Sequence, residues 1–315
     1  MDQIQHHFIE VGGLKLHVAE IGAGSTAVIF LHGFPEIWYS WRHQMIALAK
    51  AGYRAIATEY RGYGLSDPPP DPKTVSFSDL DGDLLGIVDQ LGISKAFLVA
   101  KDFGAMVANL FALLHPEKVL GVVTIGIPYL PPGSLSSYKH LPEGFYISRW
   151  REPGRAEADF GRLDAKTVVR NVYILFSRSE IPIAEENQEI MDLVGPSTPL
   201  PPWLSEEDLA VYGDLYEKSG FQTALQVPYR YAIEELYGVV EDPVLKVPSL
   251  LIMGKEDYVF KFPGMKDYIE SGKAREFVVD LEIEFLPDGT HFVQEQLPHQ
   301  VNNLILTFLS NHEIK

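Results

Sequence analysis

The chain has 315 residues, of which 46% are hydrophobic and 22% charged, and its formal net charge is -17. This length and hydrophobicity suffice for one large domain with an insertion, while the strong negative charge argues against nucleic acid or an anionic membrane as a partner. The absence of cysteine excludes disulfides and thiolate metal sites.

Short apolar runs alternate with amphipathic segments of helix length in the first part of the chain. The apolar runs predict buried strands at 27–31, 53–58, 96–100 and 120–127, and the pattern of residues 78–91 predicts a helix. Parallel strands joined by crossover helices give this alternation, and near-continuous apolar strands are typical of a sheet covered on both faces. We therefore expect an α/β fold with a mostly parallel sheet flanked by helices.

The alternation stops after Pro128, where the Pro-Pro-Gly sequence at 131–133 indicates a loop. From about residue 141 to 237 the chain is rich in Tyr, Glu, Arg and Pro, helical patterns dominate, and residues 196–202 form an irregular stretch. The strand pattern then returns in two apolar runs, 248–253 and 281–286. We predict an α/β core, residues 1–131 and 238–315, interrupted by a helical lid, residues 132–237.

The first seven residues include an acid and lack the apolar core of a secretory signal, and no apolar run reaches transmembrane length. The last five residues match neither an ER-retention nor a peroxisomal signal. We therefore expect a cytoplasmic protein without a membrane span. No cluster has metal-ligand spacing and no Gly-rich phosphate loop occurs, so we expect no metal and no cofactor.

The segment 96–105 is the most informative part of the chain. Its apolar strand stops at Asp102, and a helical pattern follows Gly104, which is typical of a tight turn that lifts one side chain clear of a sheet. Most such elbows carry Ser, but a carboxylate is already ionised at neutral pH and needs no activating base. It favours attack on an epoxide or a carbon–halogen bond over ordinary ester hydrolysis. The alternative is an Asp that only caps the helix, but the small Gly104 and Ala105 favour the elbow.

The chain resembles the soluble epoxide hydrolases of the α/β-hydrolase superfamily, and most of all the plant ones. The matching pieces extend over nearly the full length, and their joint order and spacing carry the resemblance, since each piece alone is weak. They are residues 32–36, 38–42, 61–64, Asp102, 151–154, Asp257 and 289–292.

The resemblance implies an α/β-hydrolase fold with a catalytic triad. Asp102 would be the nucleophile, and His291, in its Gly-Thr-His-Phe context, would deprotonate the water that attacks the resulting ester. Asp257 would orient the imidazole and stabilise its cation, with the neighbouring Glu256 as a rival for that role.

The resemblance also implies roles for residues of the loop that follows the first predicted strand. The backbone N–H groups of Phe34 and Phe103 would form an oxyanion hole beside Asp102, and a cis peptide bond would precede Pro35. Glu36 would help to hold the hydrolytic water, although a glutamate in a loop is often simply solvated.

Relatives also supply two lid tyrosines that donate hydrogen bonds to the epoxide oxygen. Tyr146 matches the first. Tyr229 is our choice for the second because Arg follows it, but it lies one residue further from the Gly-Phe pair at 220–221 than in relatives. An ungapped match places Pro228 there, and a bulge caused by this proline would restore the position of the tyrosine. Tyr231 is a further candidate.

Three positions depart from the family pattern. Relatives usually carry His where this chain has Lys101, Trp where it has Phe103, and often Pro-Asp-Leu where it has residues 58–60. An ammonium group close to Asp102 would lower its pKa and weaken the nucleophile. Alternatively, Lys101 points away and pairs with an acid outside the pocket.

We expect an epoxide hydrolase that converts a neutral lipophilic epoxide to a vicinal diol through an ester on Asp102. An epoxide-opening cyclase or isomerase, a haloalkane dehalogenase and a small-molecule receptor remain alternatives on the same scaffold. Dehalogenation ranks low because Phe103 has no side-chain donor for a halide. The sequence leaves open whether the protein is a monomer or a homodimer.

Overall fold

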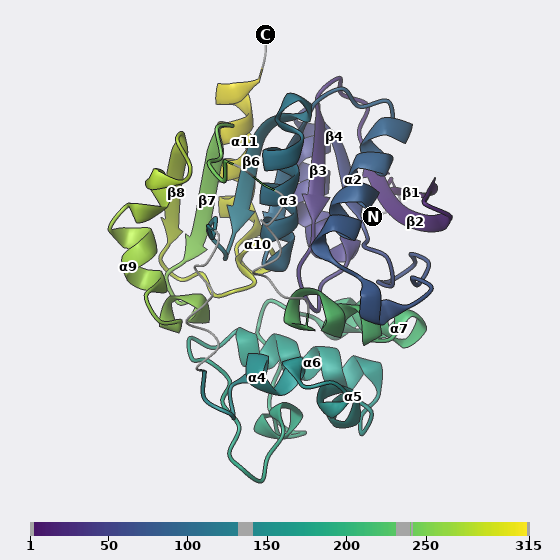
Figure 1. Cartoon of the computed structure of the whole chain (residues 1–315), viewed down its shortest axis with the longest axis vertical. Helices are drawn as coiled ribbons and strands as arrows, with labels where there is room; N and C mark the ends of the chain where they lie inside the picture. The colour runs from purple at the N-terminus through teal and green to yellow at the C-terminus, as the bar shows by residue number, and fades with distance from the viewer. Residues whose placement is uncertain (1–2, 132–140, 231–239, 241, 314–315) are drawn as a thin grey trace.

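The computed structural model describes residues 3–131, 141–230, 240 and 242–313. Within them, eight strands form one sheet in the order β1-β2-β4-β3-β5-β6-β7-β8 (Figure 1). β2 runs antiparallel to both of its neighbours, whereas the strands from β4 to β8 run parallel. The strands are β1 Gln5–Val11, β2 Leu14–Ile21, β3 Ala27–Leu31, β4 Arg54–Thr58, β5 Ala96–Lys101, β6 Val119–Ile125, β7 Ser249–Gly254 and β8 Leu281–Leu286.

Helices cover both faces of this sheet. α2 and α3 contact each other and lie in front of the sheet in Figure 1, whereas α1 and α11 contact each other on the opposite face. Helices α4 to α7 lie together beyond the carboxyl ends of the parallel strands. The helices are α1 Arg42–Lys50, α2 Phe77–Gln90, α3 Phe103–Leu114, α4 Tyr146–Arg151, α5 Arg155–Phe160, α6 Ala165–Phe176, α7 Glu206–Ser219, α8 Gln222–Leu225, α9 Met265–Glu270, α10 Val293–Gln296 and α11 Pro298–His312.

The predicted α/β fold is confirmed, and the predicted strands match β3 to β8 closely. The predicted helix at 78–91 is α2, which Ser76 caps through a reciprocal pair of hydrogen bonds with Asp79. β6 ends at Ile125 rather than at 127, because Gly126 adopts φ 81° and turns the chain. A β-carbon on Gly126 would lie 3.3 Å from Asp257 and 3.4 Å from His291, so this turn borders those two side chains.

The hairpin of β1 and β2 was not predicted, since no strand was assigned before residue 27. β1 is an edge strand on which exposed and half-buried residues alternate, so it lacks the continuous apolar run that marks the central strands. The available signal was the pair Gly12-Gly13, which connects Val11 to its partner Leu14 with φ values of 59° and 83°. Such a two-residue turn requires positive φ at both positions, which favours glycine.

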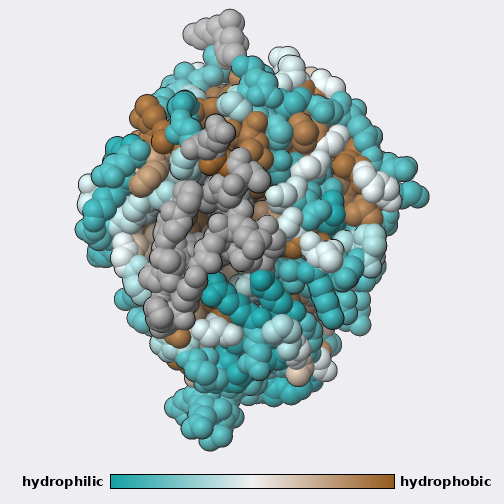
Figure 2. Space-filling view, in the orientation of Figure 1, coloured by the Kyte–Doolittle hydropathy of each residue, from teal (hydrophilic) through white to brown (hydrophobic). Residues whose placement is uncertain are grey.

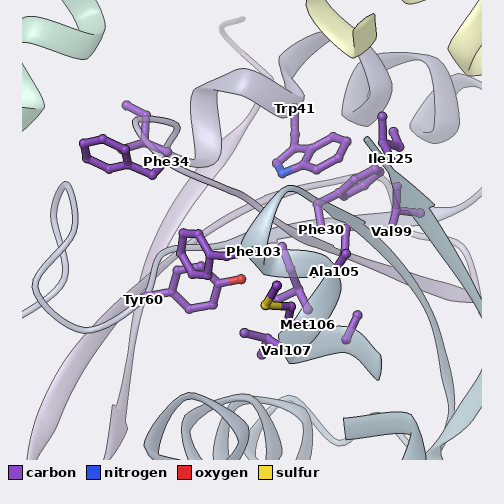
Figure 3. Packing of buried hydrophobic residues seen from close by; sticks show 14 of the residues in the cluster. Phe30, Phe34, Trp41, Tyr60, Val99, Phe103, Ala105, Met106, Val107 and Ile125 are labelled. Atoms are coloured by element: carbon purple, nitrogen blue, oxygen red, sulfur yellow. The ribbon is translucent and has the colours of Figure 1, made fainter. Parts of the chain in front are cut away.

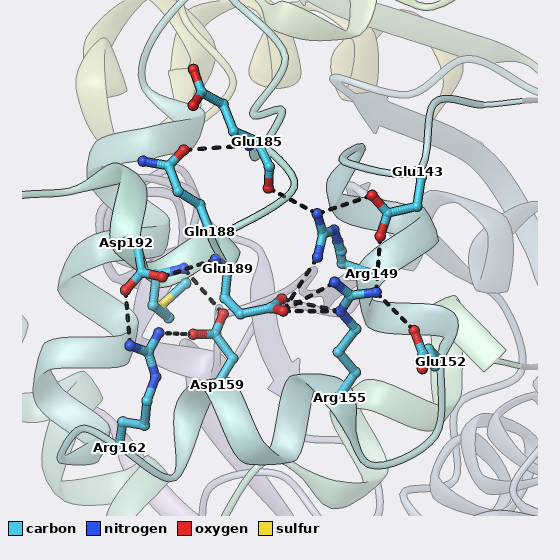
Figure 4. Close-up of polar contacts among 11 residues, drawn as sticks. Glu143, Arg149, Glu152, Arg155, Asp159, Arg162, Glu185, Gln188, Glu189 and Asp192 are labelled. Atoms are coloured by element: carbon cyan, nitrogen blue, oxygen red, sulfur yellow. Dashed lines mark hydrogen bonds and ion pairs between the residues drawn. The ribbon is translucent and has the colours of Figure 1, made fainter.

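The described part of the predicted lid, residues 141–230, is helical, and 196–202 contain neither helix nor strand. Both predicted lid boundaries involve residues outside the described ranges, so the division at 132 and 237 stays a prediction. Figure 4 shows the ion pairs that hold the first part of this region together. The nearly fully buried Arg149 binds Glu143 and Glu189 at 3.1 and 3.2 Å, and Arg155 binds the same two carboxylates at 3.0 Å each. This network fixes α4, which carries Tyr146.

A second buried network joins the lid to the core. The Glu295 carboxylate in α10 accepts hydrogen bonds from Arg42 at 2.6 Å and from the hydroxyls of Tyr173 and Tyr212 at 3.0 Å each. Arg42 also forms an ion pair with Asp208 of α7 at 3.1 Å. Because the two tyrosines lie in α6 and α7, this single carboxylate attaches both helices to the core.

Hydrophilic residues dominate the lid end of the face in Figure 2, and hydrophobic residues occur there in small, separate groups. Within the described ranges, no helix combines the length and the hydrophobicity that crossing a bilayer requires. The same residues include no group of three or more His, Asp or Glu arranged to hold a metal ion.

We predict that Glu295→Gln lowers the free energy of unfolding by about 3 kcal/mol, because it removes the main counter-ion of a buried arginine. Urea denaturation measures this change. Asp242→Asn is the matched control, since it breaks an ion pair whose partners Lys246 and Asp242 have side chains 70% and 60% exposed. The control should cost less than about 1 kcal/mol. Equal effects of the two substitutions would contradict the proposed anchoring of the lid.

Candidate active site

Asp102 occupies the turn between β5 and α3. It has φ 52° and ψ -134°, and it is the only described residue other than glycine with positive φ. This backbone conformation is costly for a residue with a side chain and persists only where the surroundings enforce it. The turn is also very tight, because a β-carbon on Gly104 would lie 2.5 Å from the carbonyl oxygen of His32. The predicted elbow is present, and it directs Asp102 into a pocket between core and lid.

His291 lies between two carboxylates. Its Nε2 is 3.3 Å from Oδ2 of Asp102, and its Nδ1 is 3.1 Å from both carboxylate oxygens of Asp257. Both His291 and Asp257 are only 2% exposed. The rival Glu256 is exposed to solvent. The structure thus brings together the three residues predicted as a triad from turns that follow β5, β7 and β8.

Charge and burial set the protonation of this group. Burial raises the pKa of Asp102, but the hydrogen bond and charge of His291 and the charge of Lys101 lower it, and the net pKa is below the ordinary value. Burial lowers the pKa of His291, but the charge of Asp257 and hydrogen bonds with Asp102 and Asp257 leave it above the ordinary value. Asp102 therefore stays ionised at a pH where His291 becomes protonated.

Lys101 is fully buried directly before Asp102. Its ammonium lies 4.9 Å from the ring centre of Phe292 and has no hydrogen-bond partner among the described residues. Within the described ranges, Lys101 therefore does not form the alternative ion pair with an acid outside the pocket. A ring face attracts a cation but does not neutralise it, so the charge acts on the site and helps to lower the pKa of Asp102.

Two backbone amides converge on the Asp102 carboxyl group. The N–H of Phe34 donates to Oδ1 at 3.3 Å, and the backbone N–H of Phe103 helps to lower the pKa of the carboxyl group. The peptide bond between Phe34 and Pro35 is cis, as the resemblance implied. These are the two donors predicted for an oxyanion hole, and they come from the ends of β3 and β5.

Glu36 is fully buried and is not a solvated loop residue. Its carboxylate accepts from the Gly33 N–H at 3.0 Å and from the side-chain amide of Gln294. A β-carbon on Gly33 would lie 2.3 Å from the Asp102 β-carbon and 2.9 Å from Glu36 Oε2, so both side chains border this glycine. Burial raises the pKa of Glu36, and the Lys101 charge opposes that rise.

Tyr146 and Tyr229 line the same pocket as Asp102, with their ring centres 6.3 Å apart. Tyr229 lies in a π-helical turn, Gln226–Arg230, inside which Val227 has non-helical φ -114° and ψ 121°. The Val227–Pro228 bond is cis. The structure thus contains the irregularity expected at Pro228, and this irregularity brings Tyr229 into the pocket. Tyr231 lies outside the described residues.

Two arginines hold the turn that carries Tyr229. Arg151 donates from Nε to the Tyr229 carbonyl oxygen at 3.3 Å, and Arg230 donates from Nε to the Trp150 carbonyl oxygen at 3.2 Å. The guanidinium of Arg230 also binds both carboxylate oxygens of Glu157 at 2.5 and 2.7 Å. These bonds tie the turn to α4 and α5, so Tyr229 is positioned by the same helices as Tyr146.

Tyr258 is a site residue that the sequence analysis missed. It is 3% exposed, lines the pocket, and places its hydroxyl 3.2 Å from that of Tyr146. Its ring also meets the His291 ring edge-on at 4.9 Å. Its position directly after Asp257 was the one available signal, since no motif marks it.

Residues 58–60, which depart from the family pattern, lie next to the site. Glu59 is buried, 2.9 Å from His17 Nδ1, and it accepts the Leu65 N–H at 2.8 Å. Figure 3 shows Tyr60 beside Phe103, with ring centres 5.3 Å apart. Tyr60 therefore packs directly against Phe103, the residue that follows Asp102.

The pocket is closed on most sides by apolar side chains. A carboxylate, three phenols and the guanidinium of Arg151 are the polar groups in its wall. The apolar residues are Phe103, Met106, Ile127, Leu130, Ile147, Pro228, Val259, Phe262 and Met265. Such a wall with few convergent polar groups suits a largely apolar small molecule.

We predict that Lys101→Met raises the pKa of His291, because the substitution removes a nearby positive charge that disfavours the imidazolium. NMR titration of histidine-labelled protein measures the midpoint, which should move to higher pH. Lys95→Met is the control, since Lys95 is exposed just before the other end of β5. An unchanged midpoint in Lys101→Met would mean that the ammonium does not act on the site.

Comparisons with known proteins agree with this geometry. The family profile described as alpha/beta hydrolase fold matches residues 26–296. "Epoxide hydrolase 2" of Siraitia grosvenorii is 37% identical over 98% of this chain and 99% of its own length. "Epoxide hydrolase A" of Mycobacterium tuberculosis is 32% identical over 98% of both chains.

Solved structures of plant enzymes are also similar. An epoxide hydrolase of Vigna radiata superposes with a TM-score of 0.91 and 36% identity, over 99% of both chains. Epoxide hydrolase I of potato, Solanum tuberosum, superposes with a TM-score of 0.88 and 34% identity, over 98% of this chain and 99% of its own. The chain therefore belongs to the α/β-hydrolase fold family and, within it, to the plant-type epoxide hydrolases.

Proposed function

We propose that this enzyme hydrolyses a lipophilic epoxide to a vicinal diol through a covalent ester on Asp102. The observation that carries the proposal is the set of polar groups around Asp102 in one apolar pocket. There the Asp102 carboxylate faces two backbone donors and His291 on the core side, and the pocket also contains lid phenols. The names of the relatives support the substrate class.

In the first step, an Asp102 oxygen attacks one epoxide carbon, so an ester bond forms while a carbon–oxygen bond of the ring breaks. The ring oxygen takes a proton from a lid phenol, with Tyr146 and Tyr229 as the donors, and that phenol becomes a phenolate. Burial raises the pKa of Tyr229 well above its ordinary value. Its hydroxyl therefore stays neutral and protonated until negative charge develops on the substrate.

In the second step, His291 takes a proton from water and the resulting hydroxide attacks the ester carbonyl. The amides of Phe34 and Phe103 stabilise the oxyanion. Collapse of the oxyanion releases the second diol oxygen, which takes the proton from the imidazolium. The carboxyl proton left on Asp102 returns to the phenolate, which restores the enzyme. Glu36, held by Gly33 and Gln294, would position the water.

The alternatives have less support. A dehalogenase needs donors for the leaving halide, and Phe103 offers no side-chain donor. A cyclase or a receptor has no use for a base and a second carboxylate buried next to the nucleophile, as His291 and Glu36 are here. We propose no second function.

Isotope labelling tests the covalent step. In a single turnover in heavy-oxygen water with excess enzyme, we expect a diol without label, because its new oxygen comes from Asp102. Mass spectrometry of the diol measures this, and label in the first diol would contradict the ester. Asp102→Asn should lose at least about 10³-fold in kcat, whereas the exposed Asp288→Asn should retain activity.

The pH dependence tests the assignment of the two steps. Ester formation needs ionised Asp102, whose pKa is lowered, and hydrolysis needs neutral His291, whose pKa is raised. As the pH falls through the pKa of His291, hydrolysis should slow while ester formation continues, so the ester should accumulate. Mass spectrometry of acid-quenched enzyme measures the ester fraction. His291→Gln should show the ester at every pH, and accumulation only at alkaline pH would oppose the assignment.

A further inference from the structure

Three phenols line the pocket, and one of them comes from the core. Tyr146 and Tyr229 belong to the lid, whereas Tyr258 follows the triad acid Asp257 after β7. The hydroxyl oxygens of Tyr258 and Tyr146 are 3.2 Å apart, which is hydrogen-bond distance. The Tyr229 hydroxyl makes no hydrogen bond to any residue in the described ranges. The two lid phenols therefore differ in their surroundings.

The Tyr258 ring is held firmly. The short helix Tyr258–Lys261 begins right after Asp257, whose side chain accepts the Val259 N–H at 2.9 Å. The ring then packs at 4.9 Å from both His291 and Phe176. Because these contacts fix the ring, the hydroxyl has a fixed position next to Tyr146.

We propose that Tyr258 is a positioning residue for epoxide opening, whose hydroxyl donates to Tyr146 so that the Tyr146 proton is directed at the epoxide oxygen. The proposal rests on the function proposed above. A hydroxyl has one proton and two acceptor lone pairs. When Tyr258 donates, the bond occupies a lone pair of Tyr146 and does not use the Tyr146 proton.

The same bond acts after the proton has moved. Tyr146 then carries a negative charge in a buried site, and a hydrogen bond to a charged acceptor is stronger than one to a neutral acceptor. Tyr258 therefore stabilises the state in which the carbon–oxygen bond of the ring has broken. Tyr229 has no such donor among the described residues, so the proposed assistance applies to Tyr146.

The test is a double-mutant cycle on ester formation. Tyr258→Phe keeps the ring contacts and removes only the hydroxyl. Single-turnover ester formation from styrene oxide should slow about tenfold in Tyr258→Phe and should not slow further when Tyr258→Phe is added to Tyr146→Phe. The rate of ester hydrolysis should stay unchanged. Trp150, whose ring centre is 5.2 Å from that of Tyr146, offers a fluorescence signal.

Tyr268→Phe is the matched control, because the Tyr268 hydroxyl donates to the Tyr129 carbonyl oxygen at 2.8 Å and does not line the pocket. It should leave both rates unchanged. Additive losses in the double variant would mean that Tyr258 acts on the substrate directly, and a faster Tyr258→Phe would mean that Tyr146 is the donor of the pair. Either result, or no change, overturns this inference. If no variant forms an ester on Asp102, the proposed function itself fails.

Discussion

The whole site depends on a carboxylate held in a strained turn and buried without losing its charge. Asp102 adopts positive φ between β5 and α3, in a turn so tight that a β-carbon on Gly104 would lie 2.5 Å from the His32 carbonyl oxygen. Burial alone raises the pKa of this carboxyl group. Its charge persists because His291, the Phe34 and Phe103 amides and Lys101 all favour the anion. The strained turn therefore places Asp102 where these groups stabilise its negative charge.

A short segment after β8 couples this carboxylate to the lid. His291 contacts the nucleophile, Gln294 binds Glu36, and Glu295 binds α6 and α7 through Tyr173 and Tyr212. His291, the Glu36 partner Gln294 and the lid anchor Glu295 thus lie within five consecutive residues.

Lys101 shows how one departure from the family pattern changes the electrostatics while the geometry is kept. Its ammonium lies against Phe292 and pairs with no carboxylate of the described residues, and its charge affects the pKa values of Asp102, Glu36 and His291. A cation keeps the nucleophile ionised, and it also opposes the imidazolium. The same charge therefore favours the ionised Asp102 that the first proposed step needs and the neutral His291 that the second proposed step needs.

The sequence by itself determined the central strands, because continuous apolar runs are local signals. The elbow at Asp102 was predicted from the apolar strand that stops there, and the roles of Asp102, Asp257 and His291 were predicted from the order of motifs that the chain shares with its family. The edge hairpin of β1 and β2 was missed because half-exposed strands carry weaker patterns. Only the tertiary structure decided where Lys101 points, how the turn at Pro228 places Tyr229, and that Tyr258 meets Tyr146. Those facts depend on packing between segments far apart in the chain, and no local pattern encodes which side chains such packing brings into contact.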